Sequence, residues 1–128
     1  MVPTKGIDLT EQTAPTTAER AVIAARAAAD KLGTDTVVLE VGDVLSIVEY
    51  FVITSASNTR LVRTIAEEVE EQVKLADGGP PIRVEGLNDG MWVLLDYGDI
   101  VVHVFLDETR EFYDLERLWS DVGRLDWE

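Results

Sequence analysis

The first third of the chain contains a stretch in which apolar residues recur at helical spacing. Thr16 and Glu19 fit a capping box that opens this stretch, and Gly33 suits the position just beyond a helix C-terminus. The spacing predicts a helix over residues 17–32, with Arg20 on its solvent side. The predicted apolar stripe of this helix consists of Val22, Ala25, Ala29 and Leu32.

A second stretch of the same kind predicts a longer helix over residues 59–76. Asn58 and the serines before it are candidate N-caps, and the glycines and prolines of residues 77–81 end the helix. Arg63 and Glu67 are spaced for an ion pair on the solvent side. The predicted apolar stripe consists of Val62, Ile65, Ala66, Val69 and Val73.

Between and after these helices the pattern changes to short runs of β-favouring residues. Turn residues such as Gly42-Asp43 and Tyr97-Gly98 separate the runs, which predict strands. A short helical segment is expected after residue 107, bound back to the sheet by Phe112, Leu115, Leu118 and Trp119. The predicted strands cover residues 35–41, 50–54, 82–85, 91–96 and 100–105.

The order of these elements predicts a single α/β (α+β) domain, with helices packed on a mixed sheet of about five strands. A length of 128 residues suits one domain, and 46% hydrophobic residues suffice for one core. We place the domain at residues 16–122. A flexible leader over residues 1–15 is expected before it, and a short tail over residues 123–128 after it.

The chain is strongly acidic, with 25 Asp plus Glu against 11 Lys plus Arg and a net charge of −14. This charge argues against direct nucleic-acid binding and against docking on anionic membranes, because both need basic surfaces. Residues 65–128 carry −12 of the net charge. The acidity serves either solubility or the steering of a basic partner.

Candidate catalytic chemistry is sparse. The chain has no cysteine and a single histidine, His103, which excludes thiolate and multi-histidine metal sites. Asp-x-Asp, glycine-rich nucleotide-binding and Gly-x-Ser-x-Gly motifs are absent from the sequence. We therefore expect no catalytic residue, no metal and no cofactor. Because no signal-peptide pattern and no apolar run of bilayer length occurs, we expect a cytoplasmic protein.

The run over residues 91–96 raises a question of exposure. Strand alternation places Trp92, Leu94 and Asp96 on one face and the apolar residues between them on the other. Either both faces are covered by the core, or the Trp92 face meets a partner, for which tryptophan is a favoured anchor. Asp96 and Asp99 flank the following turn, where aspartate commonly bonds the backbone.

Two segments carry an ordered series of motif residues. The first is the segment Ser46–Thr54, and the second runs from Val84 to Trp119. The second series includes Trp92, Asp96, Gly98, Asp99, His103, Arg110, Tyr113, Leu115, Glu116 and Trp119. Together these residues closely resemble the ribosomal silencing factor family, also called the Iojap or DUF-143 family. The resemblance covers about residues 17–119.

The resemblance implies a non-enzymatic translation repressor with a nucleotidyltransferase-like core. Such proteins are expected to bind the large ribosomal subunit through its universal protein number fourteen. A rigid domain bound there would block joining of the small subunit under nutrient limitation. Homodimers are expected for the free protein. Two alternatives stay open: a catalytically active nucleotidyltransferase-like or metal-dependent enzyme, and a homodimeric scaffold without ribosome contact.

The resemblance assigns partner contact to motif positions, first among them Trp92. Asp99 can instead hold the hairpin, and Tyr113 and Trp119 can pin the C-terminal segment to the sheet. Glu49 and Ser55 depart from the family's pattern, which usually has Asp and Gly at these positions. The candidate partner-binding residues are Trp92, Leu94, Asp96, Asp99, His103, Arg110 and Tyr113.

Overall fold

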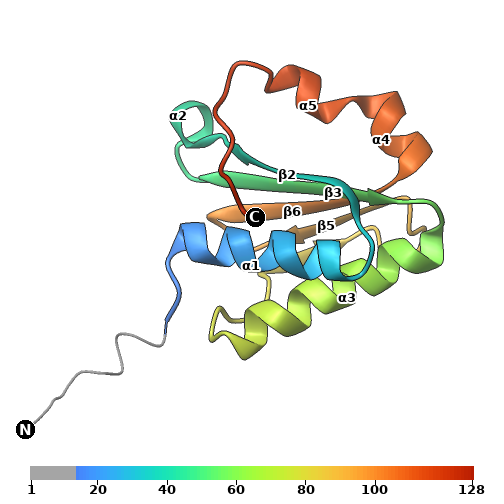
Figure 1. Cartoon of the computed structure of the whole chain (residues 1–128), viewed down its shortest axis with the longest axis horizontal. Helices are drawn as coiled ribbons and strands as arrows, with labels where there is room; N and C mark the ends of the chain where they lie inside the picture. The colour runs from blue at the N-terminus through green and yellow to red at the C-terminus, as the bar shows by residue number, and fades with distance from the viewer. Residues whose placement is uncertain (1–13) are drawn as a thin grey trace, which may run out of the picture.

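A computed structural model describes residues 14–128, so most of the expected leader lies outside the described residues. A five-stranded sheet forms the centre of the molecule (Figure 1), in the order β2-β3-β6-β5-β4. This arrangement confirms the predicted single α+β domain with a mixed sheet. The strands are β2 (Thr34–Glu40), β3 (Tyr50–Ala56), β4 (Arg83–Glu85), β5 (Trp92–Asp96) and β6 (Ile100–Leu106).

The centre of the sheet is the parallel pair β3 and β6, in which Tyr50 lies opposite Ile100. The other neighbouring strands pair antiparallel, so the last three strands form the predicted meander. Both central strands are buried along almost their whole length. Their near-continuous apolar sequences follow from this position, because both faces of a central strand are covered.

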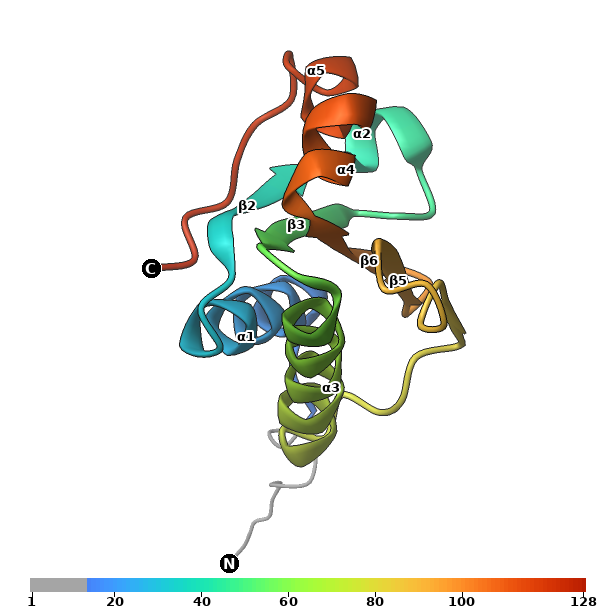
Figure 2. The same ribbon diagram turned by 90° about the vertical axis from the view of Figure 1, so that its right-hand side faces the viewer.

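Two helices cover one face of the sheet. Figure 2 shows α1 (Thr17–Asp30) and α3 (Thr59–Leu75) on the same side of the strands. The buried residues of α3 are the five that helical spacing predicted. They pack with β-strand residues such as Val52, Val93 and Val102 in the larger of the two hydrophobic clusters. This cluster forms the main core of the molecule.

The buried stripe of α1 differs from the predicted one. Val22 and Ala29 are only half-buried, and Leu32 is 75% exposed because it leaves the helix with a φ of 69°. The next residue is Gly33, and only glycine fits at this position, because a Cβ there would lie 2.4 Å from the Thr54 hydroxyl oxygen. The small side chains of the true stripe let α1 lie close to α3 and the sheet. They are Ala21, Ala24, Ala25, Ala27 and Ala28.

Both helices begin at the side-chain caps that the sequence indicates. The Thr16 hydroxyl accepts from the Glu19 N–H, and the Glu19 carboxylate accepts from the Thr16 N–H, which completes the capping box. The Asn58 side chain accepts from the Leu61 N–H at 2.8 Å at the start of α3.

Two arginines on these helices make contacts other than the predicted ones. Arg20 is not on the solvent side: its side chain is 13% exposed and forms an ion pair with Asp99. Arg63, which we expected to pair with Glu67, donates instead to two backbone carbonyls of the loop over residues 86–91, at 2.8 and 2.7 Å. Each arginine therefore ties a helix to a loop of the C-terminal meander.

The opposite face of the sheet is covered by three short helices, α2 (Gly42–Leu45), α4 (Asp107–Tyr113) and α5 (Leu115–Leu118). α2 replaces the turn predicted at Gly42-Asp43. Leu115 and Trp119 pack on this face as predicted. Phe112 and Leu118 do not, since they are 79% and 78% exposed.

The C-terminal segment, which we treated as a tail, crosses the outer edge of β2. The Leu125 N–H donates to the Val38 carbonyl, the Glu40 N–H donates to the Gly123 carbonyl, and the Trp127 indole donates to the Thr36 carbonyl. These contacts satisfy backbone groups that an edge strand otherwise exposes. Within residues 14–128, no helix combines the length and apolarity that crossing a membrane requires.

Candidate partner-binding face

The face of β5 that carries Trp92 is only partly covered. Val93 and Leu95 are fully buried under α1 and α3, whereas Trp92 and Leu94 are half-buried on the other side. The predicted alternation is therefore confirmed. Trp92 and Leu94 pack at the margin of the smaller hydrophobic cluster and keep part of their surface exposed. The strand thus has one core face and one partly open face.

Trp92 is held by a group of aromatic rings. Its ring centroid lies 4.7 Å from that of Phe105 and 5.1 Å from that of Tyr113 in α4. The indole Nε1–H donates a hydrogen bond to Nδ1 of His103 at 3.2 Å. We call the surface formed by Trp92, Leu94 and Tyr113, together with the buried His103 that supports it, the aromatic face. Four of the seven candidate partner-binding residues lie in it.

His103 lies beneath this face as a neutral side chain. It is 5% exposed, and burial lowers its pKa to about 4. Because Nδ1 accepts from Trp92, the proton of the neutral ring is on Nε2, which has no hydrogen-bond partner among residues 14–128. Phe51 packs edge-on against the ring at 4.7 Å. The arrangement makes His103 a support for Trp92 rather than an exposed contact.

Exposed apolar side chains lie on or just after the three short helices, in the same layer of the molecule as the aromatic face. Tyr113 is 55% exposed, and the residues that we call the apolar rim are exposed as well. The rim consists of Val44, Leu45, Ile47, Phe112 and Leu118. Sequence reasoning missed the first three. The apolar run after the turn residues Gly42-Asp43 was a signal that could have indicated them.

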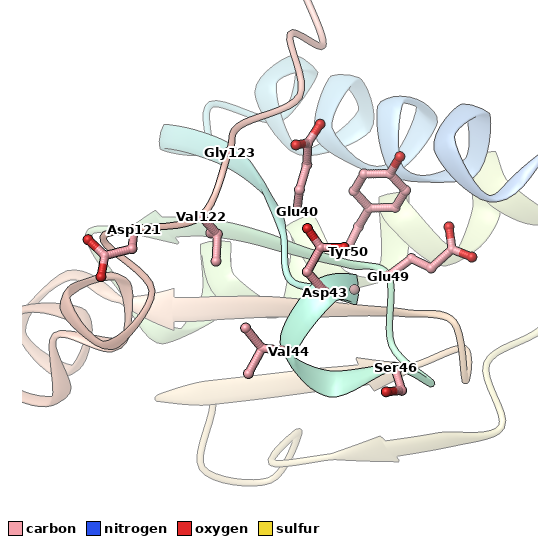
Figure 3. A pocket seen from close by; sticks show the side chains of 10 residues that line it. Glu40, Asp43, Val44, Ser46, Glu49, Tyr50, Asp121, Val122 and Gly123 are labelled. Carbon is pink, nitrogen blue, oxygen red and sulfur yellow. The ribbon is translucent and has the colours of Figure 1, made fainter.

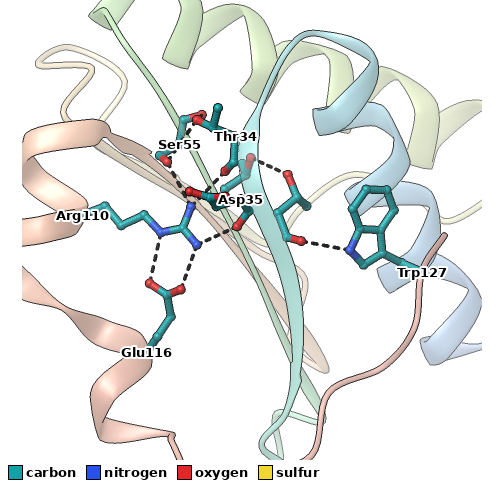
Figure 4. Close-up of polar contacts among 8 residues, drawn as sticks. Thr34, Asp35, Ser55, Arg110, Glu116 and Trp127 are labelled. Atoms are coloured by element: carbon teal, nitrogen blue, oxygen red, sulfur yellow. Dashed lines mark hydrogen bonds and ion pairs between the residues drawn. The ribbon is translucent and has the colours of Figure 1, made fainter.

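Arg110 is a structural residue in this fold. Its five N–H groups donate to both Glu116 carboxylate oxygens, to the backbone oxygens of Thr34 and Asp35, and to the Ser55 hydroxyl, at 2.7–3.0 Å (Figure 4). The hydrogen bonds from Arg110 lower the pKa of Glu116 despite its partial burial. With every donor used internally, Arg110 joins α4 and α5 to the ends of β2 and β3.

The two aspartates of the hairpin also make internal bonds. Asp96 accepts from the Gly98 N–H at 2.8 Å and from Arg83 at 3.0 Å. Asp99 accepts from Arg20 and, at 2.8 Å, from the Thr17 hydroxyl. Burial raises the pKa of Asp99, but these hydrogen bonds and the Arg20 charge outweigh it, so the net shift is downward. Asp99 thus contacts α1, away from the aromatic face.

A hollow of about 560 Å³ lies beside α2 and is lined by several carboxylates. Figure 3 shows that the side chains of Glu40, Glu49 and Asp121 point in different directions instead of meeting at one point. Burial, together with Glu40 and Glu49, raises the pKa of Tyr50. Within the described residues 14–128 no group of three or more His, Asp or Glu side chains is arranged to hold a metal ion.

The fold and these surfaces define a small α+β domain with an open aromatic face. The chain belongs to the ribosomal silencing factor family, because residues 13–128 match the family model described as "Ribosomal silencing factor during starvation". This match also includes the C-terminal segment over residues 123–128. The family name states a regulatory role.

Individual relatives agree with this assignment. The "Ribosomal silencing factor RsfS" of Bacillus subtilis is 36% identical over 104 residues, which are 81% of this chain and 87% of that protein. The mouse "Mitochondrial assembly of ribosomal large subunit protein 1" is 33% identical over 67% of this chain and 39% of its own length. A crystal structure of a Chromobacterium violaceum protein matches with a TM-score of 0.79 and 33% identity, over 83% of this chain and 88% of that one.

Proposed function

We propose that this protein represses translation by binding the large ribosomal subunit through its protein number fourteen. The bound domain would block joining of the small subunit, chiefly when nutrients are limiting. The observation that carries the proposal is the aromatic face, on which Trp92 is rigidly supported and still partly exposed. The names of the relatives, which refer to ribosome silencing and to assembly of the large subunit, support the choice of target.

The physical form of the face suits a protein partner. Buried aromatic anchors supply most of the affinity in protein interfaces, and the surrounding polar residues contribute less. Trp92 and Tyr113 are such anchors in this proposal, and the exposed ring of Phe112, 5.0 Å from that of Tyr113, adds contact area beside them. The net charge of −14 would speed encounter with a basic ribosomal protein and disfavour contact with bare RNA.

The proposal predicts that Trp92→Glu abolishes binding to large ribosomal subunits, because a charge would replace the central anchor. The measurement is co-sedimentation of the purified variant with large subunits at moderate salt. Leu75→Glu is a matched control, since Leu75 is 67% exposed on α3 in the other layer of the molecule.

Circular dichroism establishes whether the Trp92 variant is folded. A folded Trp92→Glu protein that still co-sediments like Leu75→Glu would contradict the proposed site. A wild-type protein that does not co-sediment at all would contradict the proposed function itself.

We also propose that the free protein is a homodimer that uses the same surface. Six of the eleven large apolar side chains that are exposed in the described residues belong to the layer of the aromatic face, which suits an interaction surface: Val44, Leu45, Ile47, Phe112, Tyr113 and Leu118. If one surface serves both contacts, the dimer is a storage form that must dissociate before the subunit is bound.

A further inference from the structure

A small hollow adjoins the aromatic face, between β5 and the turn that follows β4. It has a volume of about 280 Å³ and is lined by Glu85, Gly86, Trp92 and Leu94. We propose that this hollow, the cation pocket, receives a lysine or arginine side chain of the bound partner. The inference deepens the proposed function and rests on it, because the partner is the basic protein proposed above.

The orientation of Trp92 decides what the pocket offers to a ligand. The indole N–H is already donated to His103 Nδ1 inside the molecule. It is therefore not available to an acceptor on a partner, and in our proposal the part of the ring that lines the hollow presents its π electrons to the cation. Such a surface attracts ammonium and guanidinium groups, with tryptophan the strongest of the aromatic side chains.

Glu85 supplies the negative charge beside this ring. It lies opposite Leu94 in the β4–β5 pairing, and its side chain is 61% exposed. Arg83, its neighbour two residues away on β4, is held by Asp96 at 3.0 Å and approaches Glu85 only to 3.8 Å. Because Asp96 offsets the charge of Arg83, the Glu85 carboxylate can attract a second cation.

Gly86 allows the backbone to turn at the edge of the hollow. Its φ of 87° is unfavourable for any residue with a side chain, and a Cβ at this position would lie 2.0 Å from the Trp92 carbonyl oxygen. The backbone therefore turns tightly between Glu85 and the loop. The turn leaves space beside the indole that no side chain of Gly86 can fill. An apolar wall, an aromatic ring and one carboxylate together match a long side chain with a cationic end.

The first test reverses the charge of the pocket. Glu85→Lys should weaken binding to large subunits about tenfold, because it places a cation where the partner's cation would lie. Glu71→Lys is the matched control, with the same change of charge at an exposed position on α3. The measurement is titration of fluorescently labelled protein with large subunits at one fixed salt concentration.

Equal weakening by both variants would show a general charge effect and overturn the cation pocket. No weakening by Glu85→Lys would overturn it as well. These failures are distinct from failure of the proposed function, in which the wild-type protein itself does not bind.

The second test separates the π face from plain apolar contact. Trp92→Phe and Trp92→Leu both lose the indole N–H, but only the phenylalanine variant keeps an aromatic ring. We expect the phenylalanine variant to bind large subunits about threefold more tightly than the leucine variant, or better. Equal affinity of two folded variants would overturn the assignment of the ring to a cation.

Discussion

At the scale of single residues, several side chains that are candidate partner contacts in the sequence form contacts within the molecule instead. His103 is the clearest case. Its imidazole is buried, accepts from Trp92 and is neutral, because burial lowers its pKa to about 4. The unfolded chain, in contrast, binds a proton with a pKa near 6.5. Protonation is thus linked to unfolding at this residue.

This linkage predicts that His103 costs stability as the pH falls. Above about pH 6.5 the ring is neutral in both states, so it has no effect; between pH 6.5 and 4 only the unfolded state is protonated. The free energy of unfolding should fall by about 2 kcal/mol more in the wild type than in His103→Asn between pH 7.5 and 5. Urea unfolding at the two pH values measures the difference. Identical pH dependence would contradict the buried neutral state.

At the scale of elements, the structure shows how α1 is attached to the rest of the molecule. Asp99 in the β5–β6 turn accepts from Thr17 and Arg20 in the first turns of the helix. The Arg20 side chain is 13% exposed, and this carboxylate is its counter-ion. Asp99 therefore holds α1 to the meander, which is a structural role.

Asp99→Asn should lower the free energy of unfolding by about 1–2 kcal/mol, because it leaves the Arg20 charge without a counter-ion in a partly exposed site. Thermal unfolding compares it with Asp89→Asn, a charge change in an exposed loop. The depressed pKa of Asp99 means that its contribution is present above the unfolded value near 3.8 and is lost at lower pH. Loss of ribosome binding by the folded Asn variant, with unchanged stability, would refute this role.

The two long helices also show how much of the buried surface can be predicted from the sequence. The spacing of Val62 to Val73 predicted the buried face of α3, since large apolar residues mark it without ambiguity. Alanine does not indicate in this way which face of a helix is buried. The buried stripe of α1 was therefore predicted on the face that carries the larger Val22 and Leu32, whereas the alanines form it. Which face of a helix is buried depends on its neighbour, and a tight helix pair favours the smallest side chains.

Long-range contacts limit the prediction of the site in the same way. Four of the candidate partner-binding residues, Trp92, Leu94, His103 and Tyr113, lie next to one another. Arg110 does not join them, because its guanidinium reaches residues 55 to 76 positions away in the sequence. No local pattern indicates such a partner. The contacts of residues 123–128 with β2 were missed for the same reason.

At the scale of the whole molecule, the two helical layers cover their faces of the sheet to different extents. α1 and α3 seal one face, whereas the layer of short helices leaves the aromatic face partly open and carries further exposed apolar residues. This asymmetry supports the proposal that one surface serves both self-association and ribosome binding. The two contacts would then compete.

Competition predicts that large subunits convert dimers to bound monomers. Ile47, which is 79% exposed in the apolar rim, offers a probe. Ile47→Glu should shift the free protein toward the monomer without lowering its thermal stability, because the side chain lies outside the core. Sedimentation velocity measures the shift, with Leu32→Glu, 75% exposed at the end of α1, as the control. A cross-linked dimer that still binds large subunits would contradict competition.

The position of β6 between β3 and β5 ties completion of the fold to the end of synthesis. Tyr50 pairs with Ile100, so β3 cannot complete its pairing until β6, a strand late in the chain, has been synthesised. Until then β3 has an unpaired apolar edge, which invites aggregation. Non-local pairing of this kind also slows folding. A nascent chain that stalls before residue 100 therefore has a hairpin of β2 and β3 with no central partner, and it remains a substrate for chaperones and proteases.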